Sequence, residues 1–161
     1  MELKKERYCC CNMLKEFRER GFEPVKDAPK DTILPKRANK NDAGYDVFSP
    51  CDIHIPNGLS KTIWLNIKAY MPDNEYARIE NRSSLMSKRD VMLFCSGIVD
   101  AGYYSNPDND GNIGIRFLNF GAPYDVKKGD KICQIIFQEY KITDDDVASG
   151  ERIGGFGSTG K

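Results

Sequence analysis

The residues with the clearest capacity for chemistry lie in the glycine-rich run Gly154–Gly160, near the end of the 161-residue chain. The glycines let the backbone turn several N–H groups toward one cluster of anionic oxygens, and Ser158 and Thr159 add hydroxyl donors. Phe156 has no packing neighbours among these glycines, so its ring is available to stack on a nucleobase. The run therefore predicts a tail that binds phosphate and a base, and a disordered glycine tail is the alternative.

A second candidate is the acid that follows an apolar segment. Val91–Val99 is mostly apolar and Asp100 comes directly after it, so the chain leaves a buried strand at a carboxylate that can face a pocket. An aspartate is ionised at neutral pH, and it can orient an attacking water or accept its proton. Arg82 offers a planar fork that matches phosphate oxygens, beside the hydroxyl of Ser83. These residue types suit hydrolysis of a nucleoside triphosphate.

The elements that must position these residues are mostly strands. Residues 2–20 have a helical apolar stripe that ends at Gly21, and from Phe22 onward apolar residues recur with a period of two. Turn residues separate the alternating segments, which predicts an all-β sandwich or barrel. We expect an N-terminal helical extension over 1–21, a β domain over 22–150 and the tail over 151–161. The main alternating segments are 63–67, 91–99, 113–117 and 133–137.

Composition limits the classes of partner. Lys plus Arg and Asp plus Glu number 24 each, so no global basic field favours a nucleic-acid polymer or an anionic membrane. No apolar run is long enough to span a bilayer and residues 1–6 lack the apolar region of a signal peptide, so we expect a cytoplasmic protein. We expect all six cysteines to be reduced thiols, because a domain of this size with no secretion signal does not need disulfides. The one histidine, His54, is expected on the outer face of a strand.

Five clusters, taken in order, resemble the five motifs of the homotrimeric dUTP diphosphatases. The resemblance implies a distorted jelly-roll β-barrel with a mobile C-terminal tail, a homotrimer with shared active sites, and Mg²⁺ as cofactor. It also implies hydrolysis of dUTP to dUMP and diphosphate. The clusters are Ala43–Asp46, Arg82–Leu85, Gly97–Tyr103, Gly129–Gln134 and Arg152–Gly160.

The resemblance assigns roles to the polar residues of the first four clusters. Asp100 is the expected base, and Asp46 is expected to fix waters of the Mg²⁺ ion. Tyr103 is expected to lie against the deoxyribose, where a 2′-hydroxyl would clash. The groups expected to hold the phosphate chain are Arg82, Ser83, Ser84 and Gln134.

The resemblance also places the base and the tail. We expect backbone groups of the hairpin that includes Gly97 and Ile113 to read uracil, because Phe94 replaces an Asn that some relatives use. Arg152 is expected to bind the γ-phosphate, although it lies four residues before Phe156 where five is commoner. The other tail residues expected at the substrate are Phe156, Gly157, Ser158 and Thr159.

One departure and two alternatives stay open. Seven residues, Tyr104–Asp110, separate Tyr103 from Gly111 where most relatives have one, so the backbone of the uracil pocket is not fixed by the resemblance. A dCTP deaminase shares the fold, but its essential Glu corresponds to Arg116 here. A nucleotide-binding regulatory protein, acting through the N-terminal helix, is the other alternative.

Overall fold

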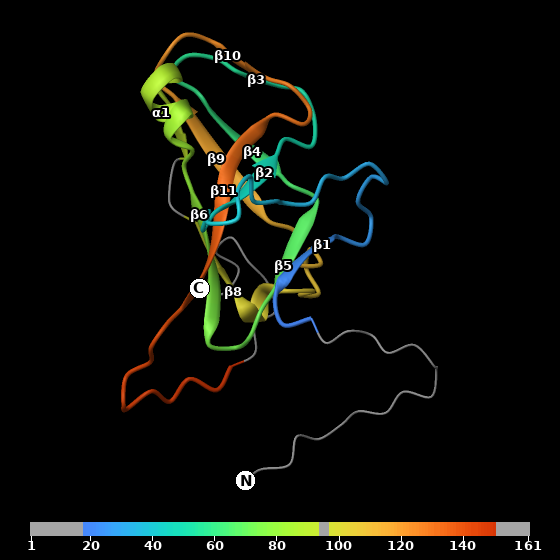
Figure 1. The fold of residues 1–161 in the computed structure, drawn as a ribbon, viewed down its shortest axis with the longest axis vertical. Coiled ribbons are helices and arrows are strands. Elements are labelled where there is room, and N and C mark those ends of the chain that lie inside the picture. Colours follow the sequence, from blue (N-terminus) through green and yellow to red (C-terminus); the bar gives the residue numbers. More distant parts are fainter. Residues whose placement is uncertain (1–17, 94–96, 151–161) are drawn as a thin grey trace.

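The computed structural model describes residues 18–93 and 97–150, and the regular elements of this part are almost all short strands (Figure 1). One α-helix and one 3₁₀ turn interrupt the strands. The all-β expectation is therefore confirmed for the described part of the chain. The elements are β1 Gly21–Pro24, β2 Tyr45–Phe48, β3 Ile53–Ile55, β4 Ser60–Trp64, β5 Ile67–Tyr70, β6 Glu75–Glu80, α1 Ser83–Arg89, β7 Val91–Leu93, β8 Gly97–Asp100, η1 Ala101–Tyr103, β9 Gly114–Asn119, β10 Tyr124–Val126 and β11 Lys131–Glu139.

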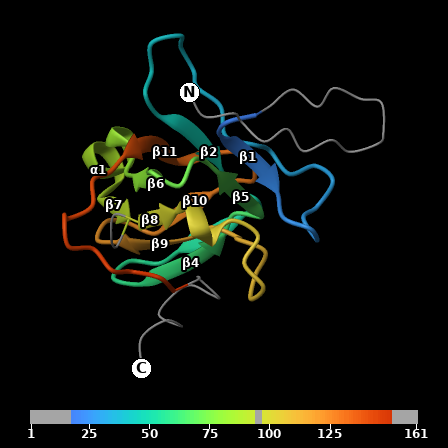
Figure 2. The ribbon, with the colours of Figure 1, turned by 90° about the horizontal axis from the view of Figure 1, so that it is seen from below.

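The strands form antiparallel sheets that pack as two layers. One layer is the sheet β2-β11-β6-β8, and a second sheet has the order β4-β9-β7. The pairs β1-β5 and β10-β3 extend this arrangement at its sides. Figure 2 shows β2, β11 and β6 in one layer and β9 with β4 in the other. Strand β8 lies at the edge of its sheet, which matters for the site below.

The core lies between these layers and is made by the alternating apolar positions. Along β6 and β9 buried and more exposed side chains alternate strictly or nearly so, as expected for strands with one covered face. His54 on β3 is exposed and its Nδ1 lies 2.7 Å from Oδ1 of Asp125, so its outward position is confirmed. Fully buried side chains include Val47, Ile55, Ile67, Val91, Ile113, Phe117, Ile132 and Ile135.

The N-terminal expectation is partly wrong. Residues 18–20 are not helical and Gly21 already belongs to β1, where it pairs with Tyr70 of β5. Arg20 bonds Glu75 at the start of β6 instead: its Nε and Nη2 donate to the two carboxylate oxygens at 2.9 and 2.7 Å. Residues 2–17, which hold most of the expected helix, lie outside the described residues.

Two ends of the β domain carry different candidate residues. Helix α1 lies at one end, whereas β8 runs toward the other end (Figure 1).

In the described ranges, no helix has the length and apolar character needed to cross a bilayer. The two described cysteines, Cys51 and Cys133, are free thiols, and burial raises the pKa of Cys133 far above its ordinary value.

Candidate active site

A buried carboxylate organises the first group of predicted residues. Asp46 of β2 is 5% exposed, and its Oδ2 lies 2.7 Å from Nζ of Lys131 on β11. Its Oδ1 lies 3.4 Å from Nε of Arg82, the residue that precedes α1. Two cations around one carboxylate leave an excess of positive charge. The cluster Asp46, Arg82, Lys131 and Gln134 can therefore attract an anion, and we call it the cationic cluster.

A β-bulge brings Lys131 and Gln134 to the same place. In a regular strand, residues three apart point to opposite faces of the sheet. The pairing of β11 with β2 shifts between Lys131 and Cys133, and both Ile132 and Cys133 are buried. This extra residue turns the lysine back to the face that carries Gln134, whose Nε2 lies 3.4 Å from Oδ1 of Asp46.

The residue before β2 must be small for Gln134 to lie where it does. A Cβ added to Gly44 would stand 2.7 Å from Oε1 of Gln134 and 3.1 Å from its Cδ. The glutamine amide thus lies directly over the Gly44 backbone. Gly44, in the first predicted cluster, and Gln134, in the fourth, are therefore in contact although 90 residues apart.

The second predicted cluster joins the cationic cluster through its arginine. Arg82 is in an extended conformation at the start of α1, and its Nη1 donates to the carbonyl oxygen of Lys131 at 3.1 Å. Ser83 and Ser84 are the first two residues of the helix, the former exposed and the latter half-buried. Buried Leu85 fixes the helix against the core, so the arginine and the serines are held at its start.

A cavity of about 210 Å³ lies between β8 and β9. Three predicted substrate residues line it, namely Gly97, Tyr103 and Ile113. Most of its remaining wall is apolar, made by residues such as Leu93 and Ile115. Asp100 ends β8 one residue after Val99, which also lines the cavity, and the aspartate is exposed. The structure therefore brings the predicted base next to an apolar cavity.

Backbone groups border this cavity on both sides. Strand β8 pairs only with β6, so within the described residues no strand covers its outer edge. On the other side, β9 contributes Gly114, Ile115 and Arg116 to the wall of the cavity. An unpaired strand edge presents N–H and C=O groups in a row. Such edges can hydrogen-bond the donor and acceptor atoms of a flat base.

The cationic cluster and Asp100 are far apart within one chain. Gln134 pairs with Glu80 at one end of β6, while Asp100 pairs with Tyr76 at the other. Four residues of strand separate these positions, which is about 13 Å at 3.3 Å per residue. The two groups are therefore not brought together in a single chain.

Comparison with known proteins establishes the family of this chain. A family model described as dUTPase matches residues 30–160. The chain belongs to the dUTPase family. A deoxyuridine 5′-triphosphate nucleotidohydrolase of Lactococcus lactis is 36% identical over 146 residues, which cover 88% of this chain and 97% of that protein.

Solved dUTPase structures share the fold. The crystal structure of the Streptococcus mutans dUTPase matches 77% of this chain and 98% of its own, with 30% identity and a TM-score of 0.73. A dUTPase of the Staphylococcus aureus phage phi11 shares the fold at 19% identity and a TM-score of 0.68, and that protein coordinates a structural Mg(II) ion. The expected jelly-roll-like all-β architecture is thus confirmed.

Several predicted residues lie outside the described part of the chain, and one residue of the site was not predicted. Arg152, Phe156, Gly157, Ser158 and Thr159 lie outside the described residues, as does Phe94. Lys131 was not expected at the site, because a lysine at the start of a strand ordinarily points into solvent. The adjacent apolar pair Ile132-Cys133 interrupts the alternation and is the one sequence signal of the bulge that turns it inward.

Proposed function

We propose that this dUTPase family member hydrolyses dUTP to dUMP and diphosphate by attack of water on the α-phosphorus. The observation that carries the proposal is the position of Asp100, an exposed carboxylate at the end of β8, the strand whose other residues, 97–99, line an apolar cavity. The cavity accepts the base and the sugar. The α-phosphate lies outside the cavity and faces the aspartate. Hydrolysis of a phosphoanhydride needs an aligned water, a base and neutralised charge.

Asp100 supplies the base. Its carboxylate orients a water and accepts the water's proton as the new bond to the α-phosphorus forms. The bond from the α-phosphorus to the bridging oxygen breaks, and diphosphate leaves. The positive charges of Arg82 and Lys131 stabilise the negative charge on the phosphate oxygens.

Discrimination against ribonucleotides is assigned to Tyr103. Its side chain is 6% exposed and forms part of the cavity wall. A ring fixed there excludes a 2′-hydroxyl by its bulk, so UTP is rejected without a specific polar contact. Backbone groups of Gly97 and Gly114, which line the cavity, read uracil, since backbone groups of fixed direction can oppose the amino group of cytosine.

The donor set fits a Mg²⁺ ion that is held mainly by the substrate. Among the described residues, no group of three His, Cys, Asp or Glu side chains could form a cage of its own. Asp46 Oδ1 has only contacts of 3.4 Å, so it keeps a lone pair for a water bound to the ion. When bound with the nucleotide, Mg²⁺ neutralises charge on the phosphates. Asp46 is the residue that would orient its waters.

A homotrimer with shared sites explains the distance between the two halves of the site. Asp100 and the cationic cluster of one chain are about four strand residues apart along β6, roughly 13 Å. If Asp100 of one subunit faces the cationic cluster of a second, both can act on one triphosphate. The tail of residues 152–161 then closes the site with Arg152, Phe156 and Ser158 on the nucleotide.

The substrate range tests the proposed function. With Mg²⁺ present, we expect rapid release of diphosphate from dUTP and weak or no release from dCTP, dTTP and UTP, measured by chromatography of the products. Comparable turnover of UTP would contradict the role of Tyr103. Ammonia release from dCTP would assign the chain to the deaminase class, a result opposed by Arg116, whose guanidinium bonds Ser60 Oγ at 2.7 Å where that class needs an acid.

A further inference from the structure

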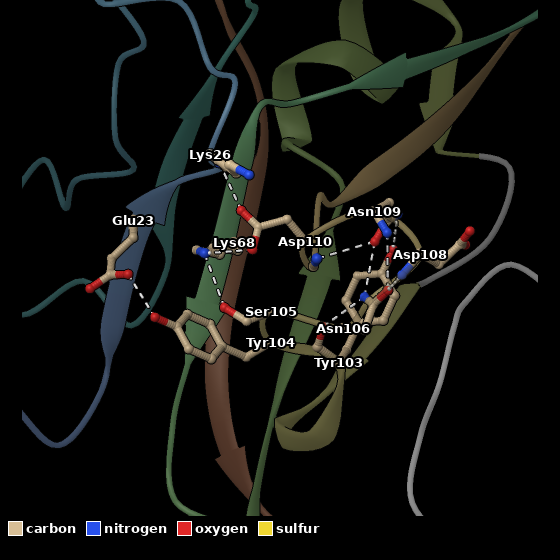
Figure 3. A network of polar contacts seen from close by, with 11 residues as sticks. Glu23, Lys26, Lys68, Tyr103, Tyr104, Ser105, Asn106, Asp108, Asn109 and Asp110 are labelled. Carbon is tan, nitrogen blue, oxygen red and sulfur yellow. Dashed lines mark hydrogen bonds and ion pairs between the residues drawn. The ribbon is translucent and has the colours of Figure 1, made fainter.

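The inserted segment Tyr104–Asp110 is attached to the β1-β5 sheet (Figure 3). Asp110 Oδ1 accepts a hydrogen bond from Lys68 Nζ at 2.8 Å, and its Oδ2 accepts one from the backbone N of Lys26 at 2.7 Å. The bond from Lys68 lowers the pKa of Asp110, so this ion pair is present at neutral pH. Tyr104 donates its hydroxyl to Glu23 at 2.7 Å. The outer part of the segment therefore has fixed anchors.

The inner part is held by a buried asparagine. Asn106 is 4% exposed, and its Nδ2 donates to the carbonyl oxygen of Tyr103 and to Oδ1 of Asn109, both at 2.9 Å. Its Oδ1 accepts from the backbone N of Asp108 and Asn109 at 3.0 and 3.1 Å. All the polar atoms of this side chain have partners. A buried network that is fully satisfied makes the segment rigid.

Asn109 connects this network to the ring that lines the cavity. Its Nδ2 donates to the hydroxyl of Tyr103 at 2.7 Å, and that hydroxyl donates to the carbonyl oxygen of Asn112 at 2.9 Å. The amide orientation is fixed because Asn109 Oδ1 faces two donors, Nδ2 of Asn106 and the backbone N of Gly111. The tyrosine hydroxyl is thus held by one donor and one acceptor. Figure 3 shows the donor, Asn109, beside Tyr103.

We propose that Asn109 is a positioning residue that fixes Tyr103 against the sugar and thereby sets the preference for deoxyribonucleotides over ribonucleotides. The proposal rests on the proposed function. Exclusion by bulk requires a wall that does not yield, since a ring that can shift by a fraction of an ångström admits one extra hydroxyl. The insertion is a rigid support for this wall, anchored on β1 and β5 and ending at the tyrosine hydroxyl.

The test compares kcat/KM for dUTP with kcat/KM for UTP. Asn109→Ala removes the donor to Tyr103, and we expect the dUTP-to-UTP ratio to fall about tenfold or more, mainly through a gain with UTP. Tyr103→Phe keeps the ring and removes the hydroxyl, so we expect a similar fall. Because both changes break the hydrogen bond between Asn109 Nδ2 and the Tyr103 hydroxyl, the double variant should show little further fall.

A matched control separates positioning from general stability. Tyr104→Phe removes a phenol hydrogen bond of the same kind and 2.7 Å length in the same segment, but on the side away from the cavity, so the ratio should stay unchanged. An unchanged ratio in folded Asn109→Ala would overturn the proposal. If that variant fails to fold, an unchanged ratio in Tyr103→Phe does so. Absence of dUTP hydrolysis by the unaltered protein would instead refute the proposed function.

Discussion

Asp100→Asn is expected to lower kcat for dUTP by about 10² to 10⁴, the usual effect of removing a general base. The amide has nearly the same size as the carboxylate, and the position is exposed at the end of β8, so folding should be unaffected. Because the change removes an interaction made in the transition state, KM should change little. Steady-state kinetics at saturating dUTP measures the effect.

Asp73→Asn serves as the control for this substitution. Asp73 is also exposed and carries the same carboxyl group, but it lies before β6 and, unlike Asp100, has no lining residue of the cavity next to it in the chain. We expect its kcat to match that of the unaltered protein. Retention of more than about half the activity by Asp100→Asn would mean that another group activates the water.

Deletion of residues 152–161 is expected to abolish most activity while the fold and the assembly stay intact. Ordering a glycine-rich segment costs about 1 to 2 kcal/mol per residue, so it must be offset by contacts with the nucleotide. Without those contacts the site stays open to water, and we expect kcat/KM to fall by about 10² or more. Circular dichroism and light scattering verify the fold and the mass of the shortened chain.

Coexpression of the shortened chain with the Asp100→Asn chain tests whether sites are shared. We expect the shortened chain and the Asp100→Asn chain each to be nearly inactive alone. In mixed trimers some sites combine Asp100 from the shortened chain with a tail from the other, so activity should return. The long separation of Asp100 from the cationic cluster within one chain supports this outcome. If verified mixed trimers stay inactive, the tail serves the site of its own subunit.

Much of the fold could be predicted from the sequence, because apolar and polar residues alternate along a strand that has one buried face. The segments around Ile63, Ile115 and Ile135 are strands with those residues buried. Expected site residues from separate clusters also converge: Asp46, Arg82 and Gln134 meet in space. The motif order predicted this meeting through the family resemblance.

Other features could not be predicted because they depend on long-range contacts. Residues 18–20 were expected to be helical but are not, and Arg20 bonds Glu75 on a strand 55 residues away. Lys131 turns inward only through a bulge that is defined by pairing with β2. The length of the insertion could be read from the sequence, but its attachment to Lys68 and Tyr103 requires a tertiary structure.

The proposed mechanism, in which Asp100 activates a water that attacks the α-phosphorus, is tested most directly by locating the phosphorus that the water attacks. When dUTP is hydrolysed in ¹⁸O-labelled water, the new oxygen goes to the phosphorus that water attacks. We expect one label in dUMP and none in the diphosphate, read by mass spectrometry of the two products. Label in the diphosphate, with unlabelled dUMP, would place the attack on the β-phosphorus and contradict the mechanism built on Asp100.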